Sequence, residues 1–233
     1  LIITDSKLKK IGFELFRNTI KITRKAKLIT IPIPESHGSE PTKEVAKEML
    51  NYDVILLATT KSLSHTKARK NASKAGARIA SMPGITIDMM QRTLNVDFNK
   101  IKSIIKSIIK QLANKNKIKI TTKLGTNIEF STKGRKWISD DGIYTKKGSF
   151  GNLPAGEIFV APVEGKTNGT IIADASVGGL GKVDKNTKLV VKNGFIESIS
   201  GGKVANKFKK LLKNKLYRNV AELGVGNSGT CRL

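Results

Sequence analysis

Two glutamates occupy segments whose composition suits a rigidly held, partly dehydrated carboxylate. Glu157 follows the Gly/Pro-rich stretch 151–156 and opens an apolar, strand-like run. Glu222 lies in a similar setting, the segment 220–226 with the sequence VAELGVG. A carboxylate flanked by strand formers and close-packing glycines suits a hard or borderline cation. The pair therefore predicts a metal centre, although a surface glutamate at a strand start (Glu157) and an ion-paired carboxylate in a strand (Glu222) are the plainer alternatives.

A family resemblance strengthens the metal interpretation. The segments 152–165 and 221–224, together with the short motifs Asn-Gly-Thr at 168–170 and Asn-Gly at 193–194, resemble the thermophilic aminopeptidases, the aminopeptidase T metallopeptidases. The similarity runs from about residue 121 to residue 227. It implies that Glu157 and Glu222 are metal ligands, and that the family's remaining ligands (histidines, an aspartate and a tyrosine) lie further downstream.

The resemblance implies a metalloaminopeptidase, a hydrolase that removes N-terminal residues from peptide substrates. Two divalent ions, zinc, cobalt or manganese, would activate a water for this proteolysis. The catalytic base and the substrate-binding residues are left unassigned. Because two glutamates leave each metal short of its usual four to five ligands, we expect the chain as given to be inactive. The family likeness also implies a homodimer.

Two other functions stay open. A mononuclear iron ring-cleaving dioxygenase of the dihydroxypyridine type looks related to these peptidases, and such a site needs two histidines and one carboxylate. A noncatalytic binding protein could keep the same fold without the site. The presence of both Glu157 and Glu222 favours the dinuclear peptidase.

The formal net charge of +25 raises the question of a nucleic-acid partner. Only 8 of the 43 basic residues are arginines, the lysines are scattered along the chain, and aromatic residues make up 5%. Arginine is the preferred residue for bidentate base and phosphate contacts, and aromatic rings supply stacking platforms for single strands. We therefore expect no specific nucleic-acid partner, only salt-dependent affinity for polyanions.

Neither a membrane span nor a disulfide is expected. No segment approaches the roughly 18 apolar residues that a spanning helix needs, and no signal peptide is recognisable. Cys231 is the only cysteine, which favours a cytoplasmic setting. The chain opens at Leu1 and stops at Leu233, soon after the second glutamate, so both ends look truncated.

The first half, 1–116, has the alternating pattern of a Rossmann-like parallel sheet covered by helices. Strand-like runs occur at 28–33, 53–59 and 77–82, with the stump of another at 1–4, and helical patterns lie between them at 8–23, 41–50 and 64–75. Such alternation indicates βαβ units. The dinucleotide-binding pattern G-x-G-x-x-G is absent, so no dinucleotide is implied. An amphipathic helix at 97–116 would lead out of this domain.

The second half, 117–233, reads as a mainly β (α+β) domain that carries the two glutamates. The clearest element is a hairpin of strands 188–192 and 195–199 around an Asn-Gly turn. A helix at 204–213 and a strand at 217–223 bearing Glu222 follow. The fold class is therefore α/β, with a metal-site domain after the Rossmann-like one.

The remaining candidates have structural explanations. Glu164 is expected in a loop salt bridge and Asp174 at the end of a strand. The only histidines, His37 and His65, belong to the first domain, where His65 would follow a Ser62 or Ser64 N-cap at the edge of the sheet. Such edges often line ligand clefts, so a substrate contact is a possible role for His65.

Overall fold

The structure, a computed structural model, describes residues 1–226. It divides into two compact units that interleave along the chain. The first comprises Leu1–Lys102 and Asp140–Gly156, and the second comprises Ser103–Ser139 and the described chain from Glu157 onward. The two consecutive ranges expected from the sequence, 1–116 and 117–233, contain no such return of the chain to its first unit.

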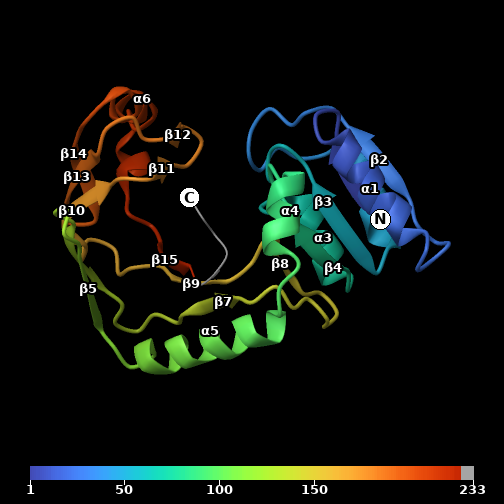
Figure 1. Ribbon diagram of the computed structural model, residues 1–233, viewed down its shortest axis with the longest axis horizontal. Helices are drawn as coiled ribbons and strands as arrows, with labels where there is room; N and C mark the ends of the chain where they lie inside the picture. Colours follow the sequence, from blue (N-terminus) through green and yellow to red (C-terminus); the bar gives the residue numbers. More distant parts are fainter. Residues whose placement is uncertain (227–233) are drawn as a thin grey trace. The chain divides into compact units, whose positions relative to one another are not determined.

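The first unit is built on a parallel sheet of five strands in the order β2-β1-β3-β4-β8 (Figure 1). The strands are β1 (Ile2–Asp5), β2 (Leu28–Ile31), β3 (Val54–Ala58), β4 (Arg78–Ser81) and β8 (Phe150–Asn152). The first four confirm the Rossmann-like expectation. Strand β8 pairs with β4 only after a long excursion of the chain, through Ile79 with Phe150 and Ser81 with Asn152.

Helices cover both faces of this sheet. The helical elements are α1 (Lys9–Thr19), α2 (Lys43–Glu48), the 3-10 turn η1 (Met49–Asn51), α3 (Lys67–Lys74) and α4 (Ile87–Thr93). Helix α5 (Phe98–Leu112) starts in the first unit and continues into the second. Residues of α2 and α3, such as Val45 and Ala72, pack with Ile55 and Ile79 of the strands. On the other face α1 and α4 pack through Ile11 and the two methionines of α4. Burial on both faces explains the continuous apolar runs of these strands.

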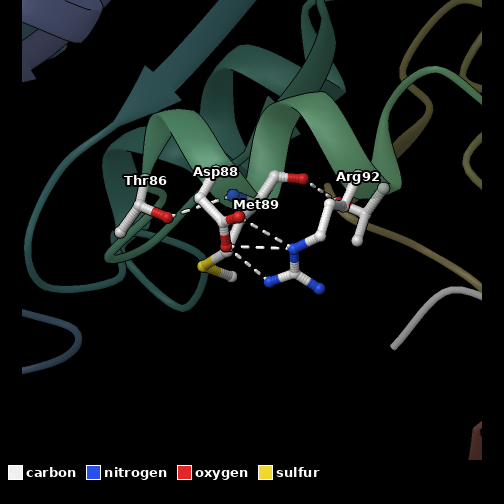
Figure 2. Close-up of polar contacts among 5 residues, drawn as sticks. Thr86, Asp88, Met89 and Arg92 are labelled. Carbon is white, nitrogen blue, oxygen red and sulfur yellow. Dashed lines mark hydrogen bonds and ion pairs between the residues drawn. The ribbon is translucent and has the colours of Figure 1, made fainter. Parts of the chain in front are cut away.

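Helix α4 shows how local sequence sets a helix start (Figure 2). Thr86 accepts a hydrogen bond from the Met89 backbone N–H at 3.1 Å, which satisfies one of the donors left free at an N-terminus. One turn along, the Arg92 guanidinium donates to both carboxylate oxygens of Asp88, at 2.6–3.0 Å. This contact lowers the pKa of the Asp88 carboxyl. The pair is exposed, so the threonine cap is the more important contribution to the helix start.

The second unit contains an antiparallel sheet in the order β14-β13-β10-β6-β5 (Figure 1). Its strands are β5 (Lys117–Thr121), β6 (Asn127–Ser131), β10 (Asn168–Ala173), β13 (Thr187–Lys192) and β14 (Phe195–Ser200). The Asn-Gly hairpin is confirmed, because Asn193 and Gly194 both adopt positive φ, as its favoured two-residue turn requires. Helix α6 (Lys203–Leu211) packs on this hairpin through Ala205 and the flanking Leu212.

Two smaller sheets complete the described chain. Strands β11 (Ser176–Val177) and β12 (Gly181–Lys182) form a short hairpin, and β7 (Ile138–Asp140), β9 (Glu157–Val160) and β15 (Leu223–Gly226) form a three-stranded sheet in the order β15-β9-β7. The strand expected at 217–223 is wrong. A 3-10 turn, η2 (Lys215–Arg218), occupies its start because the Asn214 side chain accepts the Leu216 N–H at 2.9 Å. None of the helices in residues 1–226 combines the length and apolarity that crossing a bilayer requires.

Candidate metal centre

The register of β9 and β15 places Glu157 in a ladder that begins directly after Glu222. Glu157 pairs with Gly226, and Val160 pairs with Leu223, in this antiparallel ladder. Because side chains alternate along a strand, Glu157 shares a face with Gly224. The opposite face carries the buried Ile158, Val160 and Leu223. These three buried side chains anchor the ladder to the core, and Glu157 lies on the other face.

Gly224 leaves room beside the Glu157 side chain. A Cβ atom at Gly224 would lie 3.6 Å from Oε2 of Glu157, so this carboxylate extends along the glycine toward Glu222. Glu157 lies opposite Gly226, four residues from Glu222, which is roughly 13 Å along an extended strand. Glu157 is half-buried and Glu222 is exposed. Both glutamates therefore belong to the β9–β15 region, and their sharing of one metal centre stays a prediction.

This donor set fits part of a metal site. Carboxylates such as Glu157 and Glu222 suit a hard or borderline divalent cation. Within residues 1–226, however, no cluster of three or more histidine, cysteine, aspartate or glutamate side chains could hold a metal. The described chain thus offers the acidic part of a centre and leaves a dinuclear site or a two-histidine, one-carboxylate site incomplete.

The two histidines belong to the other unit. The Nδ1 atom of His37 accepts the Ser62 backbone N–H at 3.1 Å, which explains its place without a ligand. His65 is exposed and precedes α3. The expected serine N-cap is wrong, since Thr66 caps α3 by accepting the Arg69 N–H at 3.1 Å. Ser62 and Ser64 are linked to each other instead, at 2.8 Å.

A polar network at the carboxyl edge of the parallel sheet escaped the sequence analysis. The buried Ser64 hydroxyl donates to Ser81 at 2.9 Å and approaches the Asn152 side-chain oxygen at 3.4 Å. Ser81 ends β4, and Asn152 ends β8. Carboxyl edges of parallel strands commonly line ligand sites. Because strand β8 is not recognisable from the sequence alone, nothing there indicates that Asn152 reaches Ser64, 88 residues away.

Asp140 is the second feature that sequence reasoning missed. Its buried carboxylate accepts the Tyr144 hydroxyl and the Asn152 backbone N–H, the latter at 3.2 Å. Desolvation raises the pKa of the Asp140 carboxyl, and the two hydrogen bonds oppose that rise. The Tyr144 hydroxyl also contacts the Asn152 carbonyl at 2.6 Å. This triangle fixes the end of β8, directly before the segment that leads to Glu157.

The remaining candidates have structural positions. Glu164 forms the expected ion pair, with Arg135. Asn168 accepts the Asn193 backbone N–H at 2.8 Å and so ties β10 to the hairpin turn. Asp174 lies between β10 and β11, and Cys231 lies outside the described residues.

Comparison with known proteins identifies the family. The profile of the NicX family, described as 2,5-dihydroxypyridine 5,6-dioxygenase, matches residues 6–230. The chain belongs to this family. A search of curated protein sequences finds no match.

Two solved structures share the fold. The 2,5-dihydroxypyridine dioxygenase of Pseudomonas putida is similar with a TM-score of 0.76 and 16% identity, over 97% of this chain and 70% of that one. Wild-type AmpT of Thermus thermophilus is similar with a TM-score of 0.66 and 14% identity, over 97% of this chain and 72% of that one. At these identities the likeness shows the fold alone.

These findings support the dioxygenase alternative better than the aminopeptidase that the sequence favoured. The family match names a dioxygenase, which points to an oxidoreductase instead of the expected hydrolase. The AmpT structure matches this chain with a lower TM-score than the dioxygenase structure does. The family implies a metal cofactor, and the zinc, cobalt or manganese pair expected from the sequence has only the AmpT likeness behind it.

Proposed function

We propose that this protein is a metal-dependent dioxygenase that opens the ring of a dihydroxylated pyridine. The family match over residues 6–230 carries the proposal, because it spans both units and both glutamate segments. The reaction places both atoms of O2 in the ring-opened product and needs no external reductant. The metal, when bound, supplies the redox chemistry that lets O2 react with the ring.

We assign to this centre the part of the β9–β15 region that carries Glu157 and Glu222, called the glutamate face below. A mononuclear iron site of the two-histidine, one-carboxylate kind takes one carboxylate at most. Of Glu157 and Glu222, at least one is then available to accept a proton from a ring hydroxyl of the substrate. The half-buried Glu157, extended along Gly224, is better placed for that than a fully solvated carboxylate.

A dinuclear aminopeptidase is the second candidate. The observation that favours it is that β9 pairs with β15, so that Glu157 lies in the ladder and Glu222 directly precedes it. The two activities make different demands on these residues. The peptidase needs both glutamates as ligands, whereas the dioxygenase tolerates the loss of metal coordination by one of them.

The decisive experiment compares the two reactions on one preparation. The protein is loaded with Fe²⁺ under anaerobic conditions and mixed with 2,5-dihydroxypyridine and O2, while substrate absorbance and O2 uptake are followed. A parallel sample with cobalt, zinc or manganese receives leucine p-nitroanilide. We expect one O2 consumed per ring opened and no release of p-nitroaniline. Peptide hydrolysis without O2 uptake would replace the proposal by the second candidate.

Single variants then test the residues. Glu157→Gln and Glu222→Gln are compared with Glu197→Gln, an exposed glutamate of β14 in the same unit. We expect Glu197→Gln to keep full activity and at least one of the other two to lose on the order of a hundredfold in kcat, as general-base variants do. If the Glu157 and Glu222 variants both kept full dioxygenase activity, the assignment of these two residues to the site would be wrong. The dioxygenase activity itself would still stand.

A further inference from the structure

A groove on the second unit carries a concentrated positive charge that the reaction above does not use. It has a volume of about 560 Å³ and lies along the β13–β14 hairpin and the chain that follows α6. Its lining comprises Lys192, Asn193, Phe195, Ile196, Glu197, Lys213, Lys215 and Arg218. A second hollow of about 300 Å³ shares Ile196, Glu197 and Arg218 with it and adds Lys209.

The charge here exceeds what the lysine-rich composition supplies on average. From Thr187 to Arg218 there are nine cationic residues and one carboxylate, Glu197, whereas the whole chain has 43 basic and 18 acidic residues. In the described chain, none of the four cations that line the groove forms an ion pair with a carboxylate. Like charges gathered in this way repel one another, and a bound anion relieves that repulsion.

Arg218 is held so that its guanidinium is ready for a ligand. Its Nε–H donates to the Leu212 carbonyl at 2.8 Å, which fixes the plane of the group. Within residues 1–226 no acceptor is recorded for its two terminal nitrogens. A planar guanidinium of this kind matches the oxygens of a phosphate, and the lysines around it add point charges.

The lining of the groove also includes two apolar side chains. Phe195 and Ile196 are half-buried there, and the Lys215 ammonium lies 5.6 Å from the centre of the Phe195 ring. The volume falls in the range of small-ligand pockets, about 300–1,000 Å³, whereas a nucleic-acid strand needs an extended track with several stacking rings.

From these observations we propose that the groove binds a small organic phosphate, with the phosphate on Arg218 and the surrounding lysines and the carbon part on Phe195 and Ile196. The proposal is independent of the dioxygenase reaction, since no residue of the glutamate face takes part.

The test uses calorimetric titration of the whole protein at about 150 mM salt, where long-range charge effects are screened. The probes are ADP, inorganic pyrophosphate and adenosine. We expect saturable binding of ADP, weaker binding of pyrophosphate and no binding of adenosine. The proposal would be overturned if adenosine bound as tightly as ADP, or if neither ADP nor pyrophosphate bound.

A matched pair of double variants separates the groove from the overall charge. Lys192→Gln with Lys215→Gln removes two groove cations, and Lys119→Gln with Lys123→Gln removes two exposed cations from the far edge of the same sheet. We expect ADP affinity to fall on the order of tenfold in the first and less than about twofold in the second. Equal losses in both would show attraction to net charge alone and would refute a built site.

The last test is competition between a single-stranded oligonucleotide and ADP for the groove. Under the proposal the oligonucleotide competes only weakly. Oligonucleotide binding that is much tighter than ADP binding, and that falls with added salt by a slope of several counterions, would reassign the groove to nucleic acid.

Discussion

Asp140 shows what burial does to a single carboxylate. Its pKa is raised because desolvation outweighs the hydrogen bonds from Tyr144 and from the Asn152 N–H. For a group whose folded pKa lies above its ordinary value, the stabilising contribution is fully present below that value, 3.8 for aspartate, and is lost as the pH rises through the folded pKa. Ionised Asp140 therefore lowers the stability that the protonated form would give.

The variant Asp140→Asn tests this sign. An asparagine amide can keep its oxygen toward the Asn152 N–H and turn its NH2 toward the Tyr144 hydroxyl, so one hydrogen bond to a carboxylate is lost, which we expect to cost about 1 kcal/mol. Because Asp140 makes the wild type alone lose stability as the pH rises through its raised pKa, the gap between wild type and variant should shrink as the pH rises above the ordinary value of 3.8. Urea unfolding at several pH values measures it, with Glu197→Gln as the control. A gap that stays constant or widens would contradict the raised pKa.

At the scale of elements, two threonine N-caps of different quality offer a matched comparison. Thr66 accepts the Arg69 N–H at 3.1 Å, whereas Thr42 accepts the Val45 N–H at 3.4 Å. Thr66 is also buried and donates to the Leu63 carbonyl at 2.7 Å. We expect Thr66→Ala to lower the free energy of unfolding by about 1–2 kcal/mol and Thr42→Ala by less. Urea unfolding measures both, and the reverse order would disprove the ranking.

A glycine of β10 tests the sheet of the second unit. Gly169 has a φ of +133°, and a Cβ there would lie 2.2 Å from the Asn127 carbonyl oxygen. We expect Gly169→Ala to cost about 2–4 kcal/mol, because the β6 backbone would have to move. Gly178 has open space around it, so Gly178→Ala should change stability by less than about 0.5 kcal/mol. Similar unfolding curves for the two variants would rule out the close approach of β6 and β10.

The helices and strands also show which parts of the fold can be predicted from the sequence alone. Strands β1 to β4, the Asn-Gly hairpin and α6 could be predicted because local patterns specify them. Strand β8 could not, since its three residues join the sheet only through pairing with β4. The approach of the two segments that carry Glu157 and Glu222 likewise depends on the pairing of β9 with β15, which two segments 65 residues apart do not reveal by themselves.

At the scale of the whole molecule, the family match points to an oxidoreductase and so differs from the leading sequence interpretation on the reaction. The segments around the two glutamates suggested the peptidases, which is why residue patterns alone favoured hydrolysis. The match over residues 6–230 weighs the entire chain and favours oxygenation. A cytoplasmic homodimer stays a prediction, and sedimentation of the purified protein would check the dimer.

The measurement that tests the central claim most directly is isotope incorporation from ¹⁸O2. The iron-loaded protein is given 2,5-dihydroxypyridine under labelled oxygen, and the product mass is read after a single turnover. We expect the ring-opened product to carry both labelled atoms. A product without label, or an unchanged pyridine beside active cleavage of leucine p-nitroanilide, would contradict the dioxygenase.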